Sequence, residues 1–127
     1  MERAERLKAI LELIESQMQS YRIFRTKLAS SDDPADKELL EQIARLLDRF
    51  TFEIRTEIRR TGEMDLDGSR SQEIDKDSEL LALQTTLDRY EDALSSTGKA
   101  HTRAMLNRQH LELQQAYEQL LARHRAA

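Results

Sequence analysis

The chain has 127 residues, of which 35% are charged and 39% apolar, with three glycines, one proline and a formal net charge of −4. This length suits one domain with its own core, and abundant charges with few turn residues predict long helices, each with a single apolar stripe. The negative charge argues against nucleic acid or anionic lipid as a partner, and the absence of cysteine excludes disulfides, thiolate metal sites and a thiol nucleophile.

The first ten residues, MERAERLKAI, carry several charges and lack the apolar run of a signal peptide. No later stretch is apolar for long enough to span a bilayer. We therefore expect a cytoplasmic protein that does not bind membranes.

The first half of the chain predicts two helices, over about residues 2–29 and 34–61. Asp33 is placed to cap the second helix, Pro34 suits its first position, and Gly62 is placed to end it. Apolar residues recur at steps of three and four in both segments. In the first they are Leu7, Ile10, Ile14, Tyr21, Phe24 and Leu28, and in the second Leu40, Ile43, Leu47, Phe50 and Ile54.

The second half predicts two more helices, over about residues 78–95 and 98–124. Residues 62–77 lose the helical period and gather glycine, serine and acidic residues, which indicates a long connection. Thr97 or a neighbour is expected to cap the last helix. The two apolar seams are Leu80, Leu83, Leu87, Tyr90 and Leu94, and then Leu106, Leu113, Ala116, Tyr117 and Leu120.

Four helices with one apolar stripe each bury those stripes by packing side by side at about 20°. The sequence therefore predicts an all-α, antiparallel four-helix bundle in one domain, residues 1–127, with the longer connection between the second and third helices. The alternative is a pair of helical hairpins that complete a bundle only as a dimer.

No catalytic residue is evident. Helical bundles that bind two metal ions use a Glu-x-x-His pair, because residues three apart share a helix face. The residues three positions before His101, His110 and His124 are Gly98, Asn107 and Leu121. The histidines are therefore interpreted as surface or rim residues. His110 is the exception, because it lies on the arc of the apolar seam and is expected to be partly buried and hydrogen-bonded to a neighbour such as Gln109.

Other polar groups have simple structural interpretations. Acidic clusters such as Glu53 with Glu57 are interpreted as solvated faces with arginines nearby. The glutamines Gln17, Gln84 and Gln109 are interpreted as core edges that need hydrogen-bond partners. The basic run Arg55, Arg59 and Arg60 offers an alternative function, the binding of an acidic partner.

Three apolar residues fall outside the predicted seams. Ile23, Phe52 and Leu111 take outward positions, where an isolated bundle would expose them to water. Scattered surface apolar residues are normal, but a cluster would mark an interface. We therefore predict that these three residues form the contact of a homodimer.

The sequence also resembles a ferritin-like four-helix-bundle family of bacteria that is catalogued only as a domain of unknown function. The resemblance spans most of the chain and is carried by short motifs on each helix. These are Ser20-Tyr21-Arg22, then Phe50, Glu53-Ile54, Glu57-Ile58-Arg59-Arg60 and Gly62, then Tyr90-Glu91-Asp92-Ala93-Leu94, and finally Arg108-Gln109, Glu112 and Ala116.

This resemblance implies the bundle fold and a relation to di-metal carboxylate proteins. The chain departs from the family pattern where metal chemistry would need it, since Tyr117 stands in the place of a histidine and Leu83 faces inward. We therefore expect a non-enzymatic, cofactor-free bundle that acts through protein association, as a homo-oligomer. The alternative is a degenerate di-metal protein, for which the residual ligands implied by the resemblance are Glu53, Glu112 and His110.

Overall fold

The protein consists of four α-helices. They are α1 (Arg3–Ser30), α2 (Pro34–Thr61), α3 (Glu79–Ser96) and α4 (Ala100–Ala126), and each lies within two residues of its predicted bounds. This computed structural model describes residues 3–61, 79–97 and 99–126, and within them the side chains of 8–60, 79–97 and 99–125. The predicted connection 62–77, with Gly62, lies outside the described residues, as does the side chain of Leu7.

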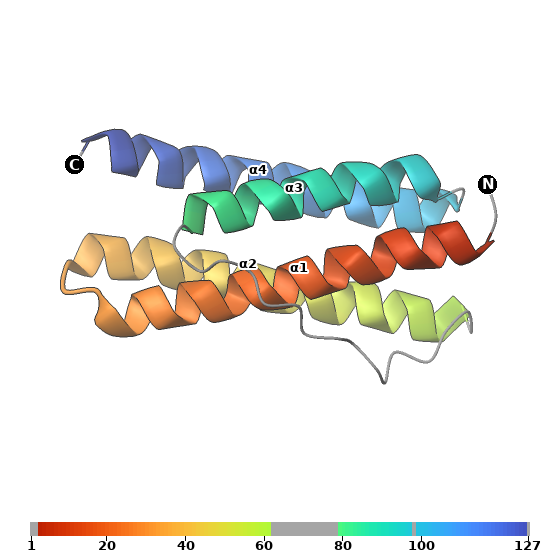
Figure 1. Ribbon diagram of the computed structural model, residues 1–127, viewed down its shortest axis with the longest axis horizontal. Coiled ribbons are helices and arrows are strands. Elements are labelled where there is room, and N and C mark those ends of the chain that lie inside the picture. The colour runs from red at the N-terminus through yellow and green to blue at the C-terminus, as the bar shows by residue number, and fades with distance from the viewer. Residues whose placement is uncertain (1–2, 62–78, 98, 127) are drawn as a thin grey trace.

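The helices form a four-helix bundle within one chain (Figure 1). α1 packs against α2 and α3, and α4 packs against α3 and α2, so that α1 lies diagonal to α4 and α2 diagonal to α3. Every neighbouring pair is antiparallel, whereas the two diagonal pairs are parallel, with α2 ending at the opposite end of the bundle from the start of α3. The bundle is therefore complete without a second chain, unlike in the two-hairpin alternative.

The turns between helices are built from local hydrogen bonds. The Asp33 carboxylate accepts a hydrogen bond from the Ala35 amide at 3.0 Å, which confirms Asp33 as the cap of α2 with Pro34 in its first position. At the second turn, the Lys99 carbonyl accepts from the Arg103 amide at 2.9 Å and so begins α4 two residues later than predicted. The Arg103 guanidinium donates to the carbonyl of Leu94, which lies in the last turn of α3.

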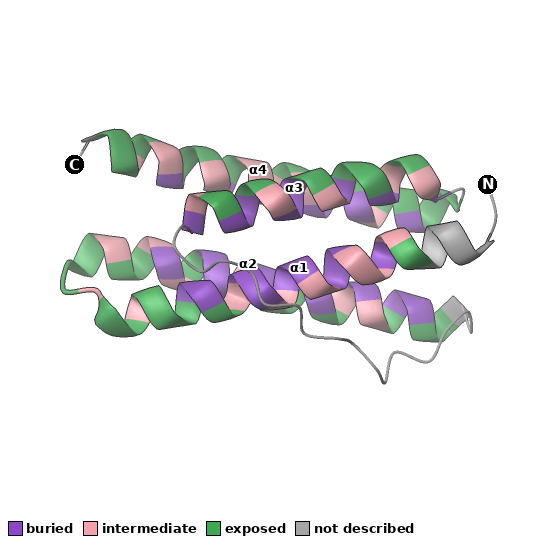
Figure 2. Ribbon diagram, viewed as in Figure 1, coloured by how far each residue is buried: buried purple, intermediate pink, exposed green. Residues whose placement is uncertain are grey.

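The core runs the length of the bundle, and the buried faces of the helices point toward its centre (Figure 2). Its completely enclosed side chains include Phe24, Phe50, Tyr90, Leu83, Leu106 and Leu113. These belong to the predicted seams. The apolar period therefore placed the core correctly on all four helices.

One of the three apolar residues predicted to face outward does not do so. Ile23, expected to face outward, is only 9% exposed. α1 packs closely against two neighbours, α2 and α3, so its buried arc is wider than one seam and takes in Ile23.

No helix among the described residues is long and apolar enough to cross a membrane.

Candidate interaction face between α2 and α4

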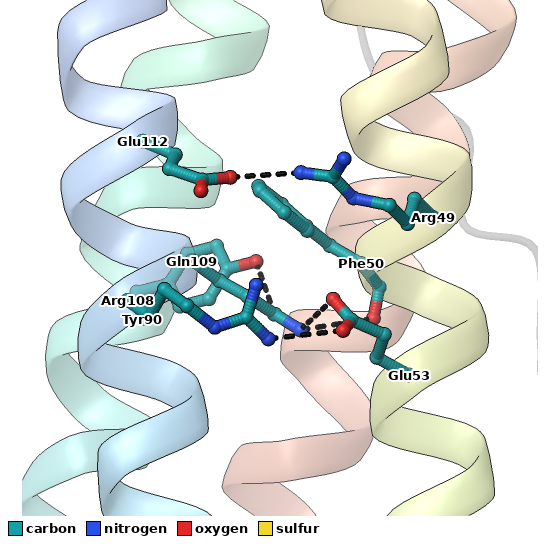
Figure 3. Close-up of polar contacts among 7 residues, drawn as sticks. All are labelled: Arg49, Phe50, Glu53, Tyr90, Arg108, Gln109 and Glu112. Atoms are coloured by element: carbon teal, nitrogen blue, oxygen red, sulfur yellow. Dashed lines mark hydrogen bonds and ion pairs between the residues drawn. The ribbon is translucent and has the colours of Figure 1, made fainter.

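A ladder of polar contacts joins α2 to α4 along their shared surface. Arg49 forms an ion pair with Glu112 at 2.9 Å and Arg108 forms one with Glu53 at 2.9 Å (Figure 3), and the His101 ring is hydrogen-bonded to Glu57 at 3.2 Å. The α2 partners lie four residues apart and therefore share one helix face. We call this surface the α2/α4 face.

The ladder supplies little binding energy between the two helices. Its side chains are mostly half-exposed, and exposed ion pairs contribute about 0.2 to 1 kcal/mol each. α2 and α4 also form the least extensive of the four helix contacts. The α2/α4 face is therefore the least tightly closed side of the bundle.

A groove of about 510 Å³ lies along this face. Phe52 and Thr56 of α2 and Ala104 and Met105 of α4 supply its uncharged lining. Its polar lining comes from the ladder residues Glu53, Glu57, His101 and Arg108. The groove thus combines an apolar strip with ion pairs in which each charge is balanced by its partner.

Two large apolar side chains are exposed on the same pair of helices. Phe52 of α2 is 69% exposed and Leu111 of α4 is 60% exposed, which confirms the outward orientation predicted for both. Phe52 precedes Glu53 and Leu111 precedes Glu112, so both lie level with the first two pairs of the ladder. Leu81, at 52%, is the other exposed large apolar residue of the described chain, and it lies on α3.

Behind the α2/α4 face, a chain of hydrogen bonds crosses the centre of the bundle. Gln17 of α1 donates to the Tyr90 hydroxyl at 2.6 Å, and Tyr90 of α3 donates to the side-chain oxygen of Gln109 at 2.8 Å. Gln109 of α4 then donates to Glu53 of α2 at 3.1 Å (Figure 3). One residue from each helix therefore takes part, and these hydrogen bonds connect the buried centre to the ladder.

Three of these four hydrogen-bonded residues are fully buried. Gln17, Tyr90 and Gln109 have no exposed surface, so the expectation that both glutamines lie at core edges is wrong. Burial raises the pKa of the Tyr90 phenol, which keeps the hydroxyl protonated as a donor. Gln84, the third glutamine of that group, is exposed on α3.

A second buried polar cluster joins α1 to α3. The Thr86 hydroxyl lies 2.7 Å from the Ser16 hydroxyl and 2.9 Å from that of Ser20. These three side chains are small, so they allow close contact between the two helices while satisfying one another's hydrogen bonds. The bundle centre is therefore more polar than the regular apolar seams predicted.

Glu57 lies where the ladder meets the groove. Its side chain is 8% exposed, so the interpretation of this residue as part of a solvated face is wrong. Arg60 contacts it at 2.5 Å, and this hydrogen bond, with smaller contributions from its charge and from His101, lowers the pKa of the Glu57 carboxyl despite burial. The carboxylate is thus held in its charged form.

The candidate metal ligands do not form a common site. Glu53 and Glu112 each pair with an arginine of the opposite helix, and the His110 ring lies 5.8 Å from that of Tyr90. His110 is half-buried, as predicted, and its ring contacts that of Tyr90, whereas the Gln109 side chain is hydrogen-bonded to Tyr90 and Glu53. Across residues 3–61, 79–97 and 99–126, no three or more histidine or acidic side chains are grouped to hold a metal ion.

The other two histidines lie near opposite ends of α4. His101 contacts buried Glu57 of α2, and His124 contacts buried Glu79 of α3 at 2.9 Å. Both histidines are exposed, as predicted for rim residues, with side-chain exposures of 73% for His101 and 43% for His124. Their acidic partners on other helices could be found only in three dimensions.

The basic run does not act as a unit. Arg60 is paired with Glu57, Arg55 donates to the sulfur of Met18 at 3.3 Å, and Arg59 is exposed. The run therefore offers fewer available cations to an acidic partner than its sequence suggests.

The fold and this face define a four-helix bundle with an apolar groove bordered by ion pairs. No protein-family model matches the chain, and neither curated proteins nor solved structures give a significant match. The resemblance to the ferritin-like family stays a prediction.

Proposed function

We propose that this protein is a non-enzymatic helical bundle that acts through protein association, forming a homo-oligomer through the α2/α4 face. The observation that carries the proposal is the exposure of Phe52 in an apolar groove on the least tightly closed side of the bundle, together with the exposure of Leu111 on α4. Exposed apolar surface bordered by polar residues is characteristic of interaction sites.

The test is the mass of the full chain in solution. Sedimentation equilibrium over a wide concentration range is expected to show reversible association of the wild type. Phe52→Asp is expected to shift the chain to monomer, because a buried unpaired carboxylate opposes association. Leu81→Asp is the matched control, since it places the same charge on exposed α3 and is expected to leave the mass unchanged.

A monomeric wild type at the highest concentration would contradict the proposal, and so would equal effects of the two variants. Circular dichroism of each variant checks that helix content is preserved.

The alternative, a degenerate di-metal protein, has a separate test. Protein grown in medium rich in iron and manganese is analysed for bound metal alongside Glu112→Ala. Stoichiometric metal that is lost in the variant would replace the association proposal. The pairing of Glu53 and Glu112 with arginines favours association instead.

A further inference from the structure

We infer that the α2/α4 face binds a second copy of this chain about a twofold axis, with Phe52 of each copy inserted into the groove of the other, against Met105. This inference rests on the proposed function and specifies the arrangement of the two chains. Four properties of the face support it.

First, one face carries both a projecting ring and a recess. Phe52 lines the groove from α2 and is 69% exposed, and Ala104 and Met105 line the groove from α4. A twofold interface uses the same patch on both subunits, so the patch must complement itself. An aromatic anchor beside an apolar recess meets that requirement, because the Phe52 ring of each copy fits the groove of the other.

Second, the face is electrically balanced. Its ion pairs contain three arginines, Arg49, Arg60 and Arg108, and three glutamates, Glu53, Glu57 and Glu112. The whole chain has a formal charge of −4, so a face of average charge would repel its own copy. The balanced α2/α4 face avoids this repulsion.

Third, the outer stripe of α4 is poor in charge. From position 104 to 122 the exposed residues are Ala104, Asn107, Arg108, Leu111, Gln115, Glu118, Gln119 and Ala122, of which two are charged. Three of the six exposed residues of α3 are charged. The six are Leu81, Gln84, Asp88, Glu91, Asp92 and Ser95. Low charge is typical of the centre of a protein interface, and on the α2/α4 face it is a property of the α4 half.

Fourth, the face is large enough. Helices of 28 and 27 residues are about 40 Å long, and two side by side are about 20 Å wide. Their outer surface thus spans roughly 800 Å² per copy, which is the contribution of each partner to an interface of standard size. Phe52 and Leu111 lie along the shared length of the two helices, so an axis near them lets both copies use much of this surface.

The test is disulfide cross-linking between full-length chains. Because the wild-type chain has no cysteine, only the introduced cysteines can form a disulfide. Phe52→Cys and Met105→Cys are prepared as separate proteins, mixed and oxidised. The mixture is expected to form a covalent dimer joined between positions 52 and 105, several-fold faster than Phe52→Cys mixed with Leu81→Cys. Mass spectrometry of the linked peptides identifies the bond.

A second measurement uses Phe52→Ala. Truncation of a central aromatic anchor is expected to raise the dissociation constant of the dimer at least tenfold, whereas Leu81→Ala leaves it unchanged. Both positions are exposed, so folding is expected to be retained in each variant.

The outcomes separate the two proposals. A monomeric wild type overturns both the proposed homo-oligomer and the twofold arrangement. A dimer that cross-links through Leu81→Cys, or that forms no 52–105 bond, overturns the arrangement and leaves self-association standing through a different contact.

Discussion

The Tyr90 hydroxyl donates a hydrogen bond of 2.8 Å to the side-chain oxygen of Gln109, and both residues are fully buried. The same hydroxyl accepts from Gln17, so one phenol satisfies polar groups from two other helices. A lost hydrogen bond in such a place is costly, because no water can replace the missing partner.

Tyr90→Phe is therefore expected to lower the free energy of unfolding by about 1 to 3 kcal/mol, since it leaves the Gln17 amide and the Gln109 oxygen without this partner. Urea unfolding at a fixed protein concentration measures the change, because self-association adds to apparent stability. Tyr117→Phe, at a half-buried position of α4, is the control and is expected to change little. Equal stability of Tyr90→Phe and wild type would contradict the role of the hydroxyl.

Glu53 and Glu112, two of the three glutamates of the ladder, are expected to contribute differently to stability. Glu53→Ala removes a partner of buried Gln109 as well as of Arg108, and we expect a loss of about 1 to 3 kcal/mol. Glu112→Ala removes an exposed pair with Arg49 and is expected to cost about 0 to 1 kcal/mol. The comparison is again made by urea unfolding, and a larger loss for Glu112→Ala would show that the connection to the buried centre is unimportant.

The contribution of Glu57 is expected to depend on pH. Its pKa lies below the ordinary value of 4.5 because of Arg60, so the unfolded chain binds a proton more readily than the folded one. The stability that Glu57 provides is therefore present in full at a pH above the pKa of the unfolded chain. It is lost as the pH falls through the lower pKa of the folded protein. The difference in unfolding free energy between wild type and Glu57→Gln should be largest near neutral pH and shrink in acid.

Glu91→Gln, on the exposed side of α3, controls for the removal of any carboxylate. A difference between wild type and Glu57→Gln that stays constant from pH 7 to acid would contradict the lowered pKa.

The burial of Ile23 predicts a large effect of its truncation. Ile23→Ala is expected to destabilise the protein by about 2 kcal/mol or more, since core truncations lose both transfer energy and packing. Leu81→Ala removes a similar volume from an exposed position and is expected to stay within about 0.5 kcal/mol of wild type. Thermal unfolding of both variants gives the comparison, and an Ile23→Ala variant as stable as the wild type would support the outward orientation predicted from the apolar seam.

The sequence by itself determined the helices, because their signals are local. The apolar period and the Asp33-Pro34 cap each depend only on residues close together in the sequence. They placed the ends of the four helices within two residues of the observed ones. The exposure of Phe52 and Leu111 followed from the same period, since each lies off the seam of its own helix.

Only the tertiary structure decided which polar groups meet. Gln17, Tyr90, Gln109 and Glu53 come from four different helices, and their hydrogen bonds depend on helix rotation and register, which a single-helix period does not specify. Ile23 was misplaced for the same reason, because its burial depends on how closely α1 packs against two neighbours. Local periodicity assigns a residue to a side of its helix, but the width of the buried arc and the partners within it are set by the packing of all four helices.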